Sequence, residues 1–424
     1  MAQLTSRPDN RCRGRVLPSA RGGAGRVVVI RWRIRERGAH GGPALAKCHF
    51  MRRRIVLAAL MLMSSVVQVG GTVVSALSVQ ALGAADPTAR STGHDAEWLG
   101  HAWVDGRKNQ SDVDMLARQL RDTGIRDLFV HAGPFNNDGT LDPALRPRAR
   151  WLTGSLHAAL PRVRVQAWLG AHPLSDQLHL HEPATRARII TAVSEVLDDG
   201  FDGVHYDFEP VGDGSEDLLA MLRETGPLAA QRGAVLSVSA IHLEPLQGVA
   251  SFARVLPAAL SLWSGDYLRQ VADLVDQVAL MSYDTGLPTA AAYAGYVRRT
   301  TERALAIVPP EVGLLIGIPA YDEGGLYHHP HAESVAAALR GIRLALADRQ
   351  RERFGVALYV DFTVNDEDWF SYHRDWYRQS PSARSRSAVN RDETVVTSNV
   401  ASPMLFSQFF CGPHGDEVGA QPIP

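Results

Sequence analysis

The sequence predicts an α/β protein whose folded part is a single (β/α)8 TIM barrel, with a non-globular N-terminal extension and a C-terminal tail. From about Glu97 to Arg378, short apolar runs rich in β-forming residues alternate with amphipathic helical stretches. This alternation is typical of successive βα units that build a parallel sheet. Eight strand candidates fit the span, and eight parallel strands joined by helices close into a barrel.

Taken in order, the strand candidates are followed by signals for helices. In the first unit, Ser111 is the expected N-cap, and Gly124 stops the helix. Pro183 opens the helix after the third strand, where its missing N–H costs nothing. The predicted strands are residues 99–104, 128–132, 163–169, 201–209, 235–241, 277–283, 312–318 and 356–360.

Composition divides the chain into four parts. Residues 1–50 are Arg-rich and have no helical or strand periodicity, so we expect a leader that is disordered or foreign to the native protein. Residues 51–85 form a signal peptide or membrane anchor, and residues 95–379 form the barrel. Residues 380–424 begin Ser- and Arg-rich and then lose periodicity, which predicts a mostly disordered tail.

The charge distribution argues against a nucleic-acid partner. The chain has 44 Arg and Lys residues and 45 Asp and Glu residues, for a net charge of −1. The basic excess lies in the first 85 residues, so from residue 86 onward 30 basic residues face 43 acidic ones. A barrel with this acidic excess repels a phosphate backbone.

The segment that begins at Met51 has the composition of an export signal. Three Arg residues and the apolar run Ile55–Val69 follow Met51, and small residues suited to cleavage stand at Ala76 and Ala85. We therefore expect a chain that starts at Met51 and is secreted or extracytoplasmic. Because residues 55–85 are long enough to span about 30 Å of hydrocarbon, a retained membrane tether is the alternative.

The most informative stretch is the fourth strand, Phe201–Glu209. Side chains alternate along a strand, so His205, Asp207 and Glu209 share one face while apolar residues occupy the other. Two neighbouring buried carboxyls repel each other, which raises one pKa and leaves the other group ionised. That arrangement suits a general acid working near neutral pH. The alternative is a salt-bridged strand end without catalytic function.

This stretch resembles the signature of family 18 glycoside hydrolases. Asp202-Gly203-Val204-His205-Tyr206-Asp207-Phe208-Glu209 matches three of the four acidic positions, and His205 stands where typical chitinases carry an inner Asp. Met281-Ser282-Tyr283-Asp284 is similar to the family's element on strand six, and Gly317-Ile318-Pro319-Ala320-Tyr321 to that on strand seven. The matches follow the family's order over about two thirds of the chain.

The resemblance implies a retaining hydrolase that uses the substrate's own acetamido group as nucleophile. Glu209 would be the general acid and base, with Asp207 and Tyr283 holding the acetamido group. Met281 and Asp284 would line the sugar pocket. The substrate would be a poly- or oligosaccharide that contains N-acetylglucosamine, such as chitin, peptidoglycan or a glycan chain.

Aromatic residues near strand ends are candidates for stacking on sugar rings, although for each one taken singly ordinary packing is the more common explanation. Tyr359 stands where many family members place a Trp. His205 is either a polar partner of Asp207 or a core histidine with no catalytic share. The candidate platforms are Trp103 at the end of the first strand, Trp168 near the end of the third, Tyr321 after the seventh, Tyr359 in the eighth and Trp369 beyond it.

Two other functions remain open at this point. A lectin that kept the barrel and lost turnover would explain His205. A metal-dependent hydrolase would use histidines that follow the third and seventh strands, namely His172, His179, His181, His328, His329 and His331. Their spacing fits no helical ligand pair, so we expect neither a metal nor a cofactor. Of the three cysteines only Cys411 follows the signal, so the mature chain cannot form a disulfide framework. We expect the protein to be a monomer.

Overall fold

The structure is a computed structural model that describes residues 70–173, 177–247, 262–325, 327–347 and 351–377, together with Ser64, Gln68 and Arg349. The predicted leader (1–50), most of the apolar run 55–69 and the predicted tail (380–424) lie outside these residues. All barrel elements fall between Asp95 and Tyr377, within the span 95–379 that the sequence assigned to the barrel.

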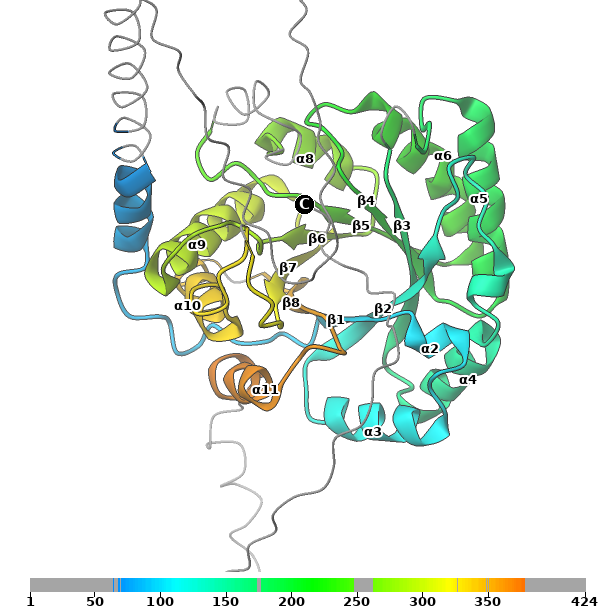
Figure 1. Cartoon of the computed structure of the whole chain (residues 1–424), viewed down its shortest axis with the longest axis horizontal. Coiled ribbons are helices and arrows are strands. Elements are labelled where there is room, and N and C mark those ends of the chain that lie inside the picture. Colours follow the sequence, from blue (N-terminus) through cyan, green and yellow to red (C-terminus); the bar gives the residue numbers. More distant parts are fainter. Residues whose placement is uncertain are drawn as a thin grey trace, which may run out of the picture. The chain divides into compact units, whose positions relative to one another are not determined.

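The strands close into a parallel barrel in the order β1 to β8, so the predicted (β/α)8 fold is confirmed. Figure 1 shows the strands at the centre and the helices around them. The strands are β1 (Asp95–Leu99), β2 (Ile125–Pro134), β3 (Arg164–Ala171), β4 (Gly203–Phe208), β5 (Val235–Ala240), β6 (Gln277–Met281), β7 (Gly313–Pro319) and β8 (Phe354–Tyr359). The main helices are α2 (Ala102–Asp105), α3 (Gln110–Leu120), α4 (Ala149–Ala159), α5 (Pro183–Asp198), α6 (Glu216–Arg232), α8 (Gly265–Ala272), α9 (Ala290–Ile307), α10 (Val335–Ala345) and α11 (Asp366–Tyr372).

The first strand lies four residues earlier than the sequence predicted. β1 contains the buried carboxyls of Asp95 and Glu97, which interrupt the apolar pattern that marks a buried strand. Asp95 is accommodated because it accepts hydrogen bonds from the Tyr372 hydroxyl and the Trp376 indole, 2.6 and 2.9 Å away. Most of the predicted strand 99–104 is instead the loop and short helix α2.

The N-cap of α3 was also predicted two residues too late. The Asn109 side chain accepts a hydrogen bond from the backbone N–H of Ser111 at 2.8 Å. The Asp112 side chain accepts one from the backbone N–H of Asn109 at 2.8 Å, which completes a capping box. Pro183 opens α5 as expected.

Two apolar clusters form the core, and they alternate along the strands. The larger one lies between strands and helices, and it includes Leu99 of β1 together with Leu128 and Val130 of β2. The smaller one fills the barrel interior, where layers of side chains from neighbouring strands pack. Its members are Ala96, Trp98, Phe129, Trp168, Ala279, Leu315, Ala357 and Val360.

A short N-terminal segment contacts the outside of the barrel. Residues 70–80 are helical, and Leu77 packs against the larger core cluster. Guanidinium groups of α9 and α10 hold the end of this helix, since Arg298 donates to the carbonyl of Gln80 and Arg340 to that of Ala81, both at 2.8 Å. Among the helices that the structure describes, none is both long and apolar enough to cross a membrane.

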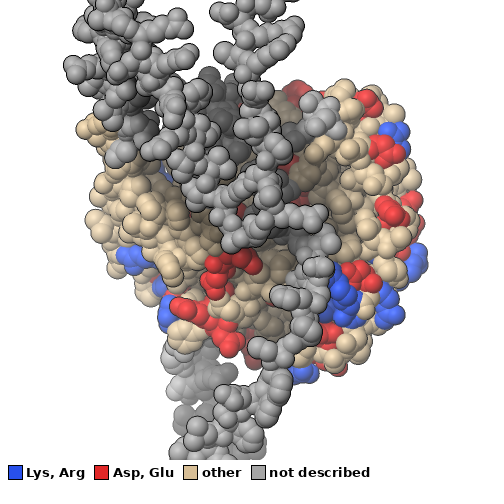
Figure 2. All heavy atoms as spheres, viewed as in Figure 1, with Lys and Arg blue, Asp and Glu red and all other residues tan. Residues whose placement is uncertain are grey.

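Acidic side chains are prominent on the face shown in Figure 2. Several gather near the lower centre of the view, and others lie along its right side, where Arg and Lys side chains are also in sight. This distribution agrees with the acidic excess of the chain after residue 86.

Candidate active site

The acids of β4 lie where the barrel fold places reactive groups, at the C-terminal end of the strands. His205 pairs in register with Trp168 of β3, and Asp207 pairs with Gly170. Glu209 follows the last residue of β4, and its backbone N–H donates to the carbonyl of Ala171 at 3.0 Å. The parallel register therefore stacks the three titratable groups of β4 along one inner face.

Glu209 has the electrostatic character of a general acid. Burial raises its pKa, and the nearby negative charges of Asp207 and Asp284 raise it further, to about 8. A ring nitrogen of His172, Nδ1, lies 2.7 Å from the Glu209 backbone carbonyl and fixes the chain at this point. The carboxyl is consequently still protonated at neutral pH.

Asp207 is held by the indole of Trp168, whose Nε1 donates to its Oδ2 at 2.7 Å. Burial raises the pKa of Asp207, whereas hydrogen bonds with Trp168 and Ser239 and the nearby His172 act in the opposite direction. Trp168 faces the barrel interior with its side chain almost fully enclosed. It acts as a hydrogen-bond donor to Asp207. The rings of Trp168 and His131 meet edge to face, with centroids 4.7 Å apart.

Tyrosines enclose the space beside the acids. The Tyr283 ring stacks on Tyr359, with centroids 5.2 Å apart and planes 20° apart. Tyr321 meets both of these rings edge-on, at 6.3 and 6.0 Å. Burial, together with neighbours that include Glu209 and Asp207, raises the pKa of Tyr283 well above its ordinary value. Its hydroxyl therefore stays a hydrogen-bond donor at any working pH. Met281 is buried at the end of β6, two residues before Tyr283.

Asp284 is anchored by residues that sequence reasoning did not connect with it. The Tyr321 hydroxyl donates to its Oδ1 at 2.5 Å, and His328 Nδ1 lies 3.2 Å from the same oxygen. Oε2 of Glu333 lies 3.5 Å from the same nitrogen, and its Oε1 accepts from the hydroxyl of Thr285 at 2.9 Å. Burial alone lowers the pKa of His328, but the two carboxylates raise it to about 9.

This triad is the one group in the described part of the chain with the spacing of metal ligands. The donor atoms of Asp284, His328 and Glu333 lie within 4.8 Å of one another. The alternative of a metal-dependent hydrolase would have used histidines from two loops, whereas this group contains one histidine and two carboxylates. An imidazolium that faces two carboxylates accounts for the cluster by ion pairing.

His179 and His181, two of the histidines that follow the third strand, contact each other with ring centroids 5.4 Å apart.

His205 lies at the bottom of the site and is completely buried. Phe129 stacks on its ring, with centroids 3.8 Å apart. Its two nitrogens contact hydroxyls of β5, Nδ1 at 2.7 Å from Ser237 and Nε2 at 2.9 Å from Ser239. Burial lowers its pKa to about 3, so the imidazole is neutral.

Two predicted platforms lie outside this group of aromatics. Trp103 is on α2 and not at the end of β1, because the first strand ends earlier than predicted. It is buried, and its Nε1 donates to Asp361 at 2.7 Å. Trp369 is on α11 in the larger core cluster, with its ring 5.6 Å from that of Tyr372.

Other polar residues of the site have weak signals in the sequence. Ser237 and Ser239 follow the two-residue alternation of β5, which places them on the inner face with His205. His131 at the end of β2 contacts His101, with Nδ1 atoms 3.1 Å apart. Burial and the neighbouring His101 lower the pKa of His131 to about 4. A histidine near the end of a barrel strand is the signal that could have identified it.

Comparisons with known proteins give similar solved structures only. No protein-family model matches the sequence, and no curated protein matches it. The spore cortex-lytic enzyme SleL of Bacillus megaterium is 14% identical, with a TM-score of 0.48 over 69% of this chain and 75% of that one. A chitinase from Chromobacterium violaceum is 14% identical, with a TM-score of 0.47 over 68% and 99% of the two chains. The Group IV chitinase of Ostrinia furnacalis is 18% identical, with a TM-score of 0.44 over 63% and 93%.

These three neighbours are two chitinases and a spore cortex-lytic enzyme. The likenesses concern the barrel.

Proposed function

We propose that the chain is a retaining glycoside hydrolase that cleaves β-linkages next to N-acetylated amino sugars. The observation that carries this proposal is the environment of Glu209. Burial, Asp207 and Asp284 raise its pKa to about 8, so a proton donor is available at neutral pH. It stands at a strand end beside a second carboxyl and a buried tyrosine hydroxyl, the groups that substrate-assisted hydrolysis requires.

In the first step, Glu209 gives its proton to the glycosidic oxygen. The acetamido oxygen of the substrate attacks the anomeric carbon, forming a new C–O bond as the bond to the leaving sugar breaks. In this proposal Asp207 holds the acetamido N–H, and the Tyr283 hydroxyl donates to the acetamido oxygen. In the second step, the Glu209 carboxylate takes a proton from water, which attacks the anomeric carbon and restores the acetamido group. Configuration is retained because the anomeric carbon is attacked twice.

The aromatic group supports a sugar-binding role for this space. Tyr359, Tyr283 and Tyr321 present ring faces and edges to one another around the acids. Aromatic rings of this kind pack well against the apolar faces of sugars. Asp284, fixed by Tyr321, is placed to accept a hydrogen bond from a sugar hydroxyl. We propose a substrate that contains N-acetylglucosamine, such as chitin, peptidoglycan or a glycan.

We also propose that the chain acts outside the cytoplasm. The support is the sequence alone, in which three Arg residues and the apolar run Ile55–Val69 follow Met51. Substrates such as chitin and peptidoglycan would be met there.

A carbohydrate-binding lectin is the competing function. The neutral His205 in place of an inner carboxyl is compatible with it. However, a buried carboxyl with a pKa of about 8 costs folding free energy at neutral pH, and binding alone does not require that cost.

The deciding experiment is hydrolysis of a chromogenic N,N′-diacetylchitobioside by the purified full chain, beside Glu209→Gln, from mildly acid to neutral pH. We expect activity in the native chain and a loss of at least about a thousandfold in Glu209→Gln, which keeps the shape and removes the acid. If neither protein hydrolyses the probe and both bind chito-oligosaccharide, the lectin function replaces the proposal.

A further inference from the structure

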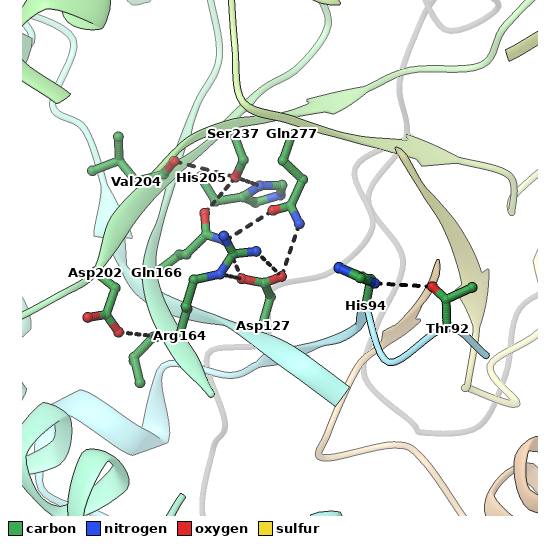
Figure 3. Close-up of polar contacts among 11 residues, drawn as sticks. Thr92, His94, Asp127, Arg164, Gln166, Asp202, Val204, His205, Ser237 and Gln277 are labelled. Carbon is green, nitrogen blue, oxygen red and sulfur yellow. Dashed lines mark hydrogen bonds and ion pairs between the residues drawn. The ribbon is translucent and has the colours of Figure 1, made fainter. Parts of the chain in front are cut away.

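Side chains inside the barrel cross-link its strands as far as His205 of β4 (Figure 3). The network starts at the completely buried carboxylate of Asp127 and reaches the imidazole of His205 through hydrogen bonds. Its other members are Arg164, Gln166, Ser237 and Gln277. Glu209 and Tyr283 follow the last residues of β4 and β6, so contacts other than this network have to fix their backbones.

Two histidines contact the backbone carbonyls of these two residues. His172 follows β3, and its Nδ1 lies 2.7 Å from the carbonyl oxygen of Glu209. His242 follows β5, and its Nε2 lies 2.7 Å from the carbonyl oxygen of Tyr283. In both cases an imidazole that follows one strand reaches the residue that follows the next strand of the barrel.

The remaining strand pairs repeat this connection. His101 follows β1, and its Nδ1 lies 3.1 Å from the carbonyl oxygen of His131 in β2. After β7 the backbone makes the contact itself, because the N–H of Ala320 donates to the carbonyl of Tyr359 at 2.7 Å. Each odd-numbered strand is therefore followed by a donor to a carbonyl of the next strand or of its end, and an imidazole supplies that donor after β1, β3 and β5.

The chemistry of the carbonyl fixes where the two imidazoles carry their protons. A carbonyl oxygen only accepts, so His172 has to be protonated at Nδ1 and His242 at Nε2. A second proton on either ring would leave the donating N–H in place, so the bond does not depend on the charge of the ring. The two histidines thus use opposite ring nitrogens for the same task.

Glu209 is held at both peptide groups that flank its Cα. Its N–H donates to the carbonyl of Ala171 at 3.0 Å, and its carbonyl accepts from His172, the next residue in the chain. Two consecutive residues of the β3 end therefore fix the backbone from which the Glu209 carboxyl projects.

Tyr283 is held between its two neighbouring strands. The N–H of Ser282 donates to the carbonyl of Gly317 in β7 at 3.2 Å, and the carbonyl of Tyr283 accepts from His242 on the β5 side. Peptide groups before and after this residue are thus tied to opposite neighbours. The two bonds fix the path of the chain from which the Tyr283 hydroxyl projects.

We propose that His172 and His242 are positioning residues, which hold Glu209 and Tyr283 in place through their backbone carbonyls. The inference rests on the proposed function, because that function gives the two held residues their part in the reaction. A reacting group that is misplaced by about 1 Å can lose roughly 100-fold in rate. Loss of either contact should therefore lower kcat and change KM little.

A role through charge is the alternative for His172. Burial raises the pKa of Asp207, and His172 is one of the groups that act in the opposite direction. Asn and Gln are both uncharged, so a role through charge is lost equally with either residue. A role through an N–H depends on where the amide nitrogen lies, and this difference separates the two explanations.

The test replaces each histidine by Asn and by Gln in the full chain. The amide nitrogen of Asn has the place of Nδ1 relative to Cβ, and that of Gln has the place of Nε2. We expect kcat on the chromogenic chitobioside to fall roughly 10- to 100-fold in His172→Gln and less than about threefold in His172→Asn. The order should be reversed at position 242, where His242→Gln keeps the donor and His242→Asn misplaces it. KM should change less than about threefold in all four variants.

His157→Asn and His157→Gln are the matched controls. His157 lies at the opposite end of the barrel strands, where its Nε2 is 2.8 Å from the carboxylate of Asp202. Both variants should leave kcat unchanged. Equal losses for Asn and Gln at positions 172 and 242, or the same order at both, overturn the proposal, because lost charge and general destabilisation do not distinguish the two ring nitrogens.

The native chain gives a second result that does not need catalysis. With ¹⁵N-labelled histidine assigned from the backbone, NMR reports which ring nitrogens carry protons. We expect a proton on Nδ1 of His172 and on Nε2 of His242, and a bare nitrogen at either place overturns the proposal even if the variants fail to fold. A native chain that shows both protons and hydrolyses no chitobioside refutes the proposed function, and the role in the reaction with it, while the two contacts stand.

Discussion

The indole nitrogen of Trp168 lies 2.7 Å from Oδ2 of Asp207, which makes this tryptophan a hydrogen-bond partner of the acid pair. Its ring is enclosed by His131 on one side and Tyr359 on another, with centroids 4.7 and 6.1 Å away. These neighbours hold the Trp168 side chain in place, so that its indole N–H donates to Asp207 of β4. Sugar stacking would need an open ring face, and the exposed fraction of this residue is 5%.

Replacing Trp168 by Phe keeps a ring and removes the donor. Hydrogen bonds to charged groups are worth about 1.5–3 kcal/mol, so we expect kcat/KM to fall roughly 10- to 100-fold. Because the lost bond lowers the pKa of Asp207, its titration should move to higher pH. Kinetics on the chromogenic chitobioside across pH measures both effects.

Trp103→Phe is the matched control for that change. Trp103 also donates from Nε1 to a buried carboxylate at 2.7 Å, but its partner is Asp361. We expect Trp103→Phe to lose about as much stability as Trp168→Phe, while the pH dependence of kcat/KM stays unchanged. An equal change of pH profile in both variants would assign the effect to general destabilisation.

Glu209→Gln should make the protein more stable at alkaline pH. The pKa of Glu209 is about 8 in the folded chain against an ordinary 4.5, so between these values the unfolded state has lost a proton that the folded state keeps. Stability of the native chain therefore falls as pH rises from about 4.5 to 8. The glutamine variant lacks this slope, and we expect it to gain roughly 1–3 kcal/mol at pH 9 and nothing at pH 4. Urea unfolding at the two pH values measures the difference; equal stability at pH 9 would contradict the raised pKa.

Asp284→Asn should move the alkaline limb of activity to lower pH. The negative charge of Asp284 is one cause of the raised pKa of Glu209, after burial and Asp207. Without it, Glu209 loses its proton at lower pH and the acid form disappears earlier. The pH dependence of kcat/KM measures the shift. Asp322→Asn, which removes an exposed acid from the loop after β7, should leave that limb in place.

His328 should stabilise the fold in a defined pH window. Its pKa is raised to about 9 in the folded chain by Asp284 and Glu333, against an ordinary 6.5. The contribution of the imidazolium is therefore complete below pH 6.5 and lost as pH rises through 9. We expect His328→Asn to cost stability at pH 6 and much less at pH 10, as measured by denaturant unfolding. His329→Asn, one residue further on, serves as the control; a cost for His328→Asn that does not depend on pH would point to packing alone.

The fold could be predicted from the sequence because barrel strands are apolar runs at regular intervals. This pattern is still recognisable when a single strand departs from it. It failed at β1, where Asp95 and Glu97 are buried within the strand. A carboxyl such as Asp95 is tolerated there by the Tyr372 hydroxyl, 277 positions away in the chain. The spacing of apolar residues within a short stretch of sequence contains no information about a partner so distant in the chain.

The site was predictable in part for the same reason. Alternation along β4 places His205, Asp207 and Glu209 on one face without reference to the rest of the chain. Whether Trp168 points inward depends on the register of β3, which an apolar run does not reveal. His328 and Glu333 come from the segment after β7 and meet Asp284, which follows β6, through the parallel pairing of these two strands, so neither has a local signal.

The N-terminal segment should be an integral part of the folded barrel from Leu77 onward. Leu77 packs on the core, and Arg298 and Arg340 bind the carbonyls of Gln80 and Ala81. We expect a chain that begins at Asp86 to unfold roughly 3–10 °C below one that begins at Leu77, because a few charged hydrogen bonds are lost. Differential scanning calorimetry of the two chains measures this.

Gly295→Ala tests the same contact from the barrel side. A Cβ on Gly295 would lie 1.8 Å from the carbonyl oxygen of Leu77, so the substitution should destabilise the chain that begins at Leu77. In the chain that begins at Asp86 the clash is gone, and alanine should add up to about 1 kcal/mol because it favours the helix. Opposite signs in the two chains establish the contact, and identical effects would exclude it.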